Sequence, residues 1–248
     1  MSATAKRLGV WVLWTLATIG LALVFLYPAG LVHVWVNHRV GIDRAMAMPW
    51  IALFIDHAVM LLIALILIAL LSKGRFGEYG LQRPQGKSYV LASIAWGAFF
   101  GVLMTVADYL PSLLAHKPPE NYPLTPVNLA GWLGFQFIYV GFTEEIPFRG
   151  LLQTFLMQRT TGRIRIGSYD MHVAGVVLAV LFALAHVASF WIHPFWFAFA
   201  QQLYAIALGI LYAYWREKSG SLTAAIIGHN LSDGVEFAIT FFLCWLWR

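Results

Sequence analysis

Long apolar segments constrain this chain more than any other feature. Seven runs approach or exceed the roughly 20 residues that an α-helix needs to cross a hydrocarbon core. The chain is 60% hydrophobic and 11% charged, whereas a soluble domain carries about 25% charged residues. We therefore predict an all-α polytopic membrane protein, folded as a single membrane domain over residues 1–248. The predicted transmembrane helices cover residues 8–31, 50–71, 89–110, 130–157, 172–190, 194–214 and 222–246.

Two segments leave the exact count of crossings open. Residues 111–128 contain Pro111, Pro118, Pro119, Pro123 and Pro126, so they read as a loop, and an eighth, half-crossing element there stays possible. The first apolar run follows Lys6 and Arg7 as in a signal peptide, but it is longer than the about 7 to 15 apolar residues of such a peptide. We expect it to be retained as the first helix.

The distribution of basic residues predicts the orientation of the helices. With the N-terminus in the cytoplasm, the cytoplasmic segments hold 11 Lys and Arg residues and the outer segments hold 4. This asymmetry follows the positive-inside rule, so the net charge of +5 reflects membrane topology and not nucleic-acid binding. We expect a multi-pass integral membrane protein, located in the cell membrane if the source is prokaryotic. The single cysteine, Cys244, excludes a disulfide framework and a cysteine-based metal site.

Ionisable residues inside the predicted helices are the candidates for function. Placing such a group at the centre of a bilayer is unfavourable by about 2.5 to 3.5 kcal/mol on insertion scales. Each one therefore calls for a partner or a role. The predicted helices contain Asp56, His57, Glu144, Glu145, Arg149, His186, His229, Asp233 and Glu236, and Asp108 lies at the end of one.

The fourth predicted helix carries two adjacent acids with different expected roles. Glu144 and Glu145 are separated by about 100° around a helix axis, so they face different environments. Glu145 and Arg149 form an i, i+4 pair with the acid first, which favours an ion pair and leaves Glu144 free. Pro147 removes a backbone donor for the carbonyl of Thr143, so a kink beside Glu144 is expected.

Polar residues on the fifth and seventh predicted helices lie at a similar depth. His186 follows Phe182 by one turn, and His229, Asp233 and Glu236 form one stripe because they are spaced by four and three residues. Such a stripe must face protein or water and not lipid. We expect Glu144, His186 and His229 to meet in one layer of the membrane.

Taken together, these motifs resemble a known family. Glu144-Glu145-x-x-x-Arg149, Phe182-x-x-x-His186 and His229-x-x-x-Asp233, in this order on separate helices, are similar to the three signature motifs of the CPBP (Abi) family of intramembrane proteases. That family includes the CAAX prenyl endopeptidases and bacteriocin-processing or self-immunity proteins. The resemblance covers roughly residues 80–240, including Gly80-Leu81-x-Arg83-Pro84.

The resemblance implies a role for each matched residue. Glu144 would activate the attacking water with help from His186, His229 and Asp233 would stabilise the oxyanion, and Glu145 with Arg149 would support them. The prenyl endopeptidases usually have Asn in place of Asp233. Because an ionised Asp cannot donate a hydrogen bond, Asp233 would be protonated, orient His229 or bind a metal.

The cofactor and the substrate stay open from sequence alone. Either no cofactor or a single divalent metal such as zinc is compatible with the residues, with Glu144, His186, His229 and Asp233 as ligands if a metal is present. The resemblance favours a glutamate mechanism without metal. The expected partners are the lipid bilayer and a peptide or lipidated protein substrate, such as a CAAX-like or hydrophobic C-terminal segment, without nucleic acid. We expect the cavity to open toward the cytoplasm or laterally to lipid.

Two other functions are considered. A non-catalytic membrane scaffold or immunity protein of the same family would contain the polar cluster without using it. A haem-binding cytochrome would use His57, His186 and His229 as axial ligands, but the acids and Arg149 have no role in it. Asp56 and His57 lie outside the resemblance and are expected to pack helices or line a cavity, and Glu236 is a candidate supporting acid.

Overall fold

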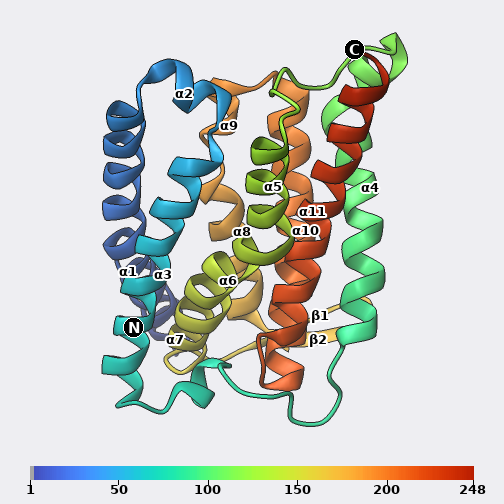
Figure 1. Ribbon diagram of the computed structural model, residues 1–248. Coiled ribbons are helices and arrows are strands. Elements are labelled where there is room, and N and C mark those ends of the chain that lie inside the picture. Colours follow the sequence, from blue (N-terminus) through green and yellow to red (C-terminus); the bar gives the residue numbers. More distant parts are fainter. Residues whose placement is uncertain (1–2) are drawn as a thin grey trace.

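The computed structural model describes residues 3–248, with side chains from Arg7 onward, as a bundle of long helices (Figure 1). The helices are α1 (Ala3–Val40), α2 (Ile42–Ala47), α3 (Trp50–Ser72), α4 (Val90–Ala115), α5 (Pro126–Gly134), α6 (Val140–Glu145), α7 (Thr154–Met157), α8 (Val173–Ala185), α9 (Ser189–Ile192), α10 (Phe195–Ser219) and α11 (Thr223–Leu246). A 3₁₀ turn covers Phe76–Tyr79, and two π-helical segments, Phe135–Tyr139 and Ile146–Gln153, join α5, α6 and α7 into one irregular rod.

Within the part of the chain that the structure describes, five helical segments are long and apolar enough to cross a membrane, namely Arg7–Val40, Trp50–Ser72, Val90–Ala115, Val173–Ile192 and Phe195–Ser219. The chain is therefore a polytopic membrane protein, but the predicted count of seven or eight crossings is not confirmed. The two other predicted crossings coincide with the α5–α7 rod and with α11. The rod is broken into short pieces, and the 24 residues of α11 carry the polar stripe of His229, Asp233 and Glu236. The segment after α4, residues 117–125, contains no helix, so the eighth element is absent there.

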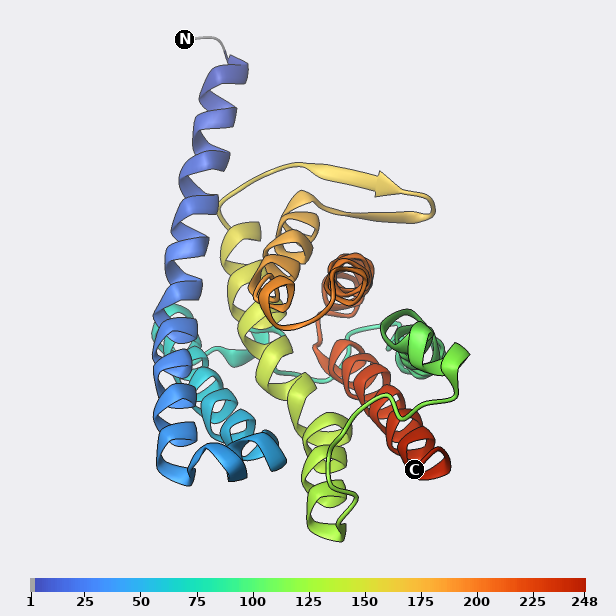
Figure 2. The ribbon, with the colours of Figure 1, turned by 90° about the horizontal axis from the view of Figure 1, so that it is seen from above.

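The bundle has two flanks with the irregular rod between them. α1 packs on α3 at one flank, α4 packs on α11 at the other, and α8 packs on α10. Seen from above, the α5–α7 rod runs diagonally between these pairs (Figure 2). The rod therefore contacts α3 on one side and α11 on the other.

The irregularity of the rod is centred on the two acids predicted to be functional. Pro147, which lacks an N–H group, lies in the second π-helical segment directly after Glu145. Between the two π segments, the N–H of Gly141 donates to Oδ1 of Asn230 at 2.7 Å, and Nδ2 of Asn230 donates to the carbonyl of Ile138 at 3.2 Å. A Cβ on Gly141 would lie 2.7 Å from that Asn230 oxygen. Glycine thus allows α11 to approach α6 closely enough to bring His229 near Glu144.

A two-stranded hairpin interrupts the predicted all-α fold. β1 (Arg163–Ile166) pairs antiparallel with β2 (Tyr169–His172) beyond the end of the rod. Glu217 of α10 holds the hairpin, since its carboxylate accepts from Arg163 Nη2 at 2.9 Å and from the backbone N–H of His172 at 2.7 Å. The hydrogen bond from Arg163 also lowers the pKa of Asp170.

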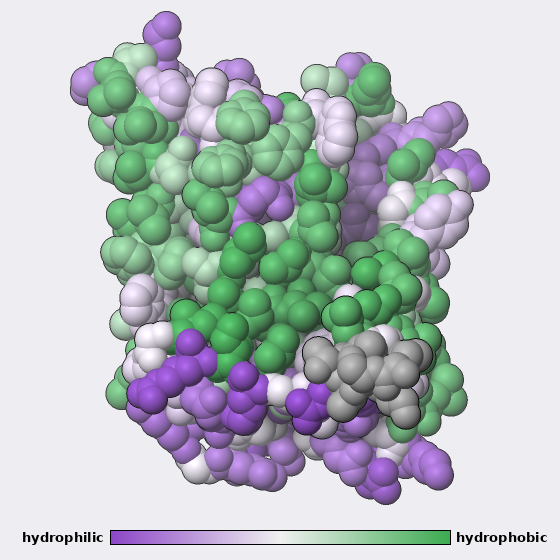
Figure 3. All heavy atoms as spheres, turned by 180° about the vertical axis from the view of Figure 1, so that it is seen from behind, coloured by the Kyte–Doolittle hydropathy of each residue, from purple (hydrophilic) through white to green (hydrophobic). Residues whose placement is uncertain are grey.

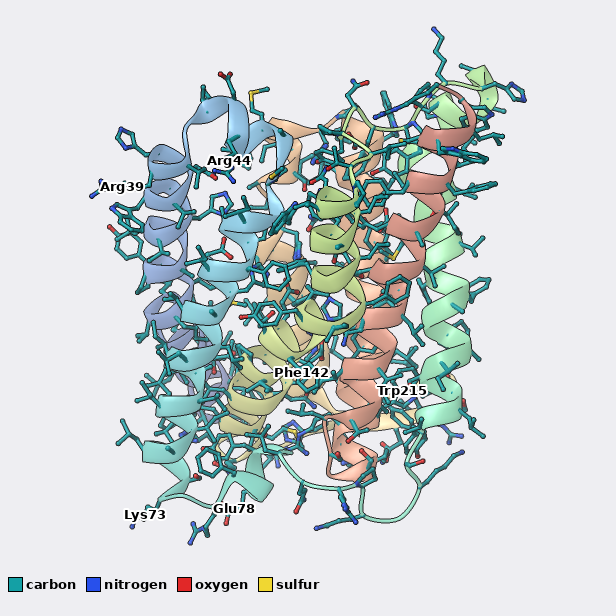
Figure 4. The ribbon with its side chains drawn as sticks, viewed as in Figure 1. Arg39, Arg44, Lys73, Glu78, Phe142 and Trp215 are labelled. Carbon is teal, nitrogen blue, oxygen red and sulfur yellow. The ribbon has the colours of Figure 1, made fainter. Side chains whose placement is uncertain are left out.

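The surface has an apolar middle and polar ends, as expected for an integral membrane protein (Figure 3). Exposed apolar side chains face outward from the long helices, for example Leu23 of α1 at 57%, Leu62 of α3 at 59% and Phe99 of α4 at 54%. Arg39 and Arg44 lie at one end of the bundle, whereas Lys73 and Glu78 lie at the other (Figure 4). The hydrophobic stretch of α3 spans the distance between these ends.

Candidate active site

Glu144 lies where four elements of the bundle converge. It stands on α6, and it faces α3, the end of α8 and α11. Its Oε1 is 3.2 Å from His57 Nε2, and its Oε2 is 3.6 Å from His229 Nε2. The separation of 3.6 Å is longer than a hydrogen bond, so Oε2 has no hydrogen-bond partner among the described residues. Within that part of the chain this oxygen is therefore unpaired although it is buried.

Glu145, unlike Glu144, is fully buried in the interior of the bundle. The expected ion pair is present, with Arg149 Nη1 3.0 Å from Glu145 Oε1 and both side chains fully buried. The same oxygen accepts from His229 Nδ1 at 2.7 Å. The guanidinium of Arg149 also lies over the ring of Phe182, 4.1 Å from its centroid. Although Glu144 and Glu145 face different environments, the ring of His229 therefore contacts both through its two nitrogens.

Asp233 lies on the side of His229 that faces Glu144. Its Oδ2 is 3.5 Å from His229 Nε2, and its Oδ1 accepts from the hydroxyl of Ser232 at 3.0 Å. Both contacts use the carboxylate as an acceptor. Of the three roles considered for Asp233, this geometry fits the orientation of His229 best.

His186 ends α8 in the middle of a candidate membrane span. Its backbone N–H donates to Ala183, which leaves the carbonyl of Phe182 to accept from His186 Nδ1 at 2.9 Å. A carbonyl can only accept, so Nδ1 carries a hydrogen, and in the neutral ring Nε2 keeps its lone pair. His186 lines the same cavities as Glu144. It therefore presents a basic nitrogen to the space beside that residue.

These side chains line a cavity of about 440 Å³. The cavity extends from Glu144, His186 and His229 to the connection after α4, where it meets Glu120 and Tyr122. Burial raises the pKa of the Glu120 carboxyl, although a hydrogen bond from Tyr109 opposes this, and it raises the pKa of Tyr122 to about 12. The volume falls within the range of roughly 300 to 1,000 Å³ typical of ligand pockets.

Glu236 does not join the group around His229. It is buried and lines the same cavity, as does Asp108, whose Oδ2 accepts from the hydroxyl of Tyr204 at 2.9 Å. Glu236 and Asp108 are therefore two further buried acids of this cavity.

His57 lines both cavities, in agreement with the expectation that it packs helices or lines a cavity. Its contact with Glu144 was not predicted: the ring lies between Asp56 and Glu144. The sequence indicated a role for His57 only through the presence of two adjacent ionisable residues, Asp56 and His57, in an apolar helix. Sequence alone could not reveal that α3 packs against α6 at this level.

The arrangement bears on both cofactors considered. Among residues 3–248, no group of three or more His, Cys, Asp or Glu side chains is placed to hold a metal ion, and the proposed reaction uses none. Both ring nitrogens of His57 and of His229 face carboxylates. This leaves only His186 with a free nitrogen among the three histidines considered as haem ligands.

The fold and the site define the class of the protein: a polytopic helical membrane protein with a buried carboxylate and histidine cluster facing a cavity. Residues 126–235 match the family described as "Type II CAAX prenyl endopeptidase Rce1-like", which confirms the family predicted from the motifs. The match indicates, at the level of the family, a CAAX-type intramembrane protease. No curated protein and no solved structure matches the chain. The matched range contains Glu144, His186, His229 and Asp233, but not α1 or α3.

Proposed function

We propose that this chain is an intramembrane endopeptidase in which Glu144 activates water to hydrolyse a peptide bond. One observation carries the proposal: Glu144, whose Oε2 has no hydrogen-bond partner among the described residues, lines the same cavity as His186, whose neutral ring has its lone pair on Nε2. A water molecule between these two acceptors can donate one hydrogen to each. Such a water is oriented and made nucleophilic by the same pair.

The reaction follows from the donors and acceptors around this water. Glu144 takes a proton as the water oxygen adds to the substrate carbonyl, and a tetrahedral oxyanion forms. His229, with its ring held between Glu145 and Asp233, donates from Nε2 to the oxyanion when it is protonated. The carbon–nitrogen bond then breaks, and Glu144 returns its proton to the leaving amine. Asp233 acts as an acceptor that orients His229 and stabilises its positive charge.

The substrate class follows from the family and from the surroundings of the site. A CAAX-type protease acts on a protein in the membrane, and the cavity combines polar groups with apolar walls such as Leu53, Phe135 and Leu208. We propose a peptide with a prenylated or otherwise hydrophobic C-terminal segment as the substrate.

The test is cleavage of a peptide panel, with and without C-terminal prenylation, followed by mass spectrometry. The purified wild-type protein is compared with Glu144→Gln, each with and without a chelator. We expect the variant to lose about 10²- to 10⁴-fold in rate, the usual contribution of a general base, and we expect cleavage to persist in chelator. Equal cleavage by both proteins would overturn the proposed site. Loss of wild-type cleavage in chelator would require a metal and a different mechanism.

A further inference from the structure

A chain of side-chain contacts connects Glu144 to the first helix, outside the segment that matches the family. Glu144 Oε1 lies 3.2 Å from His57 Nε2, and His57 Nδ1 lies 2.6 Å from Asp56 Oδ1. The other oxygen of Asp56 lies 2.6 Å from Nδ1 of His33. The contacts therefore run from α6 through α3 to α1.

The donors and acceptors in this chain have a definite direction. The Asp56 carboxylate accepts at both oxygens, so Nδ1 of His57 and Nδ1 of His33 carry the hydrogens. Asp56 thereby fixes the ring of His57 with Nε2 directed at Glu144, and when the ring is protonated Nε2 donates to Glu144 Oε1 while Nδ1 donates to Asp56. In the same way, the carboxylate of a catalytic triad orients a histidine toward the group on its other side.

Most of the side chains in these contacts are largely buried. The side chains of Asp56 and Glu144 are each 12% exposed and that of His57 is 16% exposed, whereas His33 is 36% exposed. Packing of α1 on α3 accounts for the contact between His33 and Asp56. The contact of His57 with Glu144 is formed at a second interface, where α3 packs against α6.

Glu144 also has space on two sides. A second cavity of about 240 Å³ is lined by apolar residues of α1, α3 and α8, together with Asp56, His57, Glu144 and His186. The first cavity shares His57, Glu144 and His186 with it. A carboxylate in a wall between two cavities can rotate toward either one unless a partner holds it.

We propose that His57 is a positioning residue for Glu144, oriented by Asp56 and His33. It holds Oε1 and so fixes the carboxylate in the wall between the two cavities. The proposal rests on the proposed function, in which Glu144 is the base. It also assigns α1 and α3 a part in the active site, although both precede the matched segment.

Two conservative substitutions separate positioning from packing. The amide of Gln reproduces Nε2 of histidine, so His57→Gln keeps a donor for Glu144 and loses the contact with Asp56. The amide of Asn reproduces Nδ1, so His57→Asn keeps the contact with Asp56 and loses the one with Glu144. We expect His57→Asn to lower kcat by about 10²-fold, the effect of a misplacement near 1 Å. KM should stay unchanged, and His57→Gln should retain most of the activity.

The control is His38→Gln, an exposed histidine on α1, which should leave kcat and KM unchanged. A packing role alone predicts the reverse order, with His57→Asn more active than His57→Gln. That order, or equal kcat values for the two variants, overturns the proposal.

A second measurement needs no substrate. Thermal unfolding of His57→Asn, Glu144→Gln and the double variant gives the coupling between the two side chains. We expect the double variant to lose less stability than the sum of the single losses, because both substitutions remove the same contact. Additive losses overturn the positioning role even if the protein cleaves no peptide. A wild-type protein that cleaves no better than Glu144→Gln contradicts only the proposed function.

Discussion

His229 explains how two adjacent glutamates of one helix take different parts in one site. Its Nδ1 contacts the buried Glu145 at 2.7 Å, and its Nε2 faces Glu144 at 3.6 Å. Glu145 also forms an ion pair with Arg149, so its carboxylate is held in place and is fully buried. Glu144 lines the cavity and keeps one oxygen without a hydrogen-bond partner among the described residues. The difference between the two acids arises from the partners that surround each side chain and not from their chemistry.

The buried ion pair leads to a prediction for Glu145→Gln. Arg149 is fully buried, so removing the negative charge leaves an unpaired guanidinium in the interior. We expect a loss of stability of about 3 to 5 kcal/mol, typical of breaking a buried pair. His229 loses its orienting charge at the same time, so activity should fall even at temperatures where the variant is folded. Thermal unfolding in detergent and peptide cleavage provide the two readouts.

The control for this prediction is an exposed pair. Arg75 Nε lies 2.7 Å from Glu78 Oε1, with the side chains 66% and 45% exposed. Glu78→Gln should change stability by less than about 1 kcal/mol, as surface pairs do. If Glu145→Gln were no more destabilising than Glu78→Gln, the role assigned to the buried pair would be wrong.

At the scale of elements, apolar length predicted the helices well and their internal breaks poorly. Each of the seven apolar runs corresponds to a helix or a series of helical pieces in the structure. The kink expected at Pro147 is a π-helical segment, and a second one precedes Glu144 without a proline. The first π-helical segment could not be predicted, because the contact of Asn230 with Ile138 and Gly141 that satisfies backbone groups there is a tertiary one. The hairpin was missed because its alternating Arg163-Ile-Arg-Ile pattern is only four residues long.

The candidate site also has a part that the sequence predicts and a part that depends on tertiary packing. Glu144, Glu145, Arg149, His229 and Asp233 form a contiguous group in the structure, as the helical spacing and the motifs had suggested. The contact of His57 with Glu144 depends on how α3 packs against α6. Spacing along one helix carries no information about such a contact.

The connection between α4 and α5 leads to a prediction about pH. Glu120 accepts from the hydroxyl of Tyr109 at 3.3 Å, and burial raises the pKa of its carboxyl above the ordinary 4.5. A carboxyl whose pKa is raised by folding holds its proton more tightly in the folded state, so stability falls as pH rises from the ordinary pKa through the raised one. Glu120→Gln, which stays neutral, removes this loss.

The expected result is therefore a difference that depends on pH. Near pH 4 the variant and the wild type should unfold at the same temperature, whereas at neutral pH the variant should be more stable by about 2 to 4 °C, the shift that roughly 1 kcal/mol gives a chain of this size. Thermal unfolding across this pH range measures it. A variant that is less stable at neutral pH would show that the charged carboxylate stabilises the connection.

At the scale of the whole molecule, the distribution of basic residues predicts one orientation in the membrane, whereas a cavity open to the cytoplasm would require the opposite one. The positive-inside rule places the end with Lys73 in the cytoplasm, and Arg44 then lies outside (Figure 4). The large cavity extends to Glu120 and Tyr122, in the connection at the same end as α2 (Figure 1). With this orientation, the cavity extends toward the outer surface and not toward the cytoplasm, which was one of the two expected openings, the other being lateral to lipid. The side from which a peptide reaches Glu144 therefore depends on the orientation.

Labelling with a membrane-impermeant maleimide decides the orientation. Glu78 and Arg44 are exposed on opposite sides of α3, and the only native cysteine, Cys244, is 1% exposed and provides a low background. We expect Arg44→Cys to be labelled in intact cells and Glu78→Cys only after lysis, because α3 crosses the membrane between them. The reverse pattern would invert the orientation and direct the cavity toward the cytoplasm, so that a cytoplasmic peptide could enter it directly. Labelling of both variants in intact cells would contradict the crossing by α3, and with it the membrane arrangement that brings His57 to Glu144.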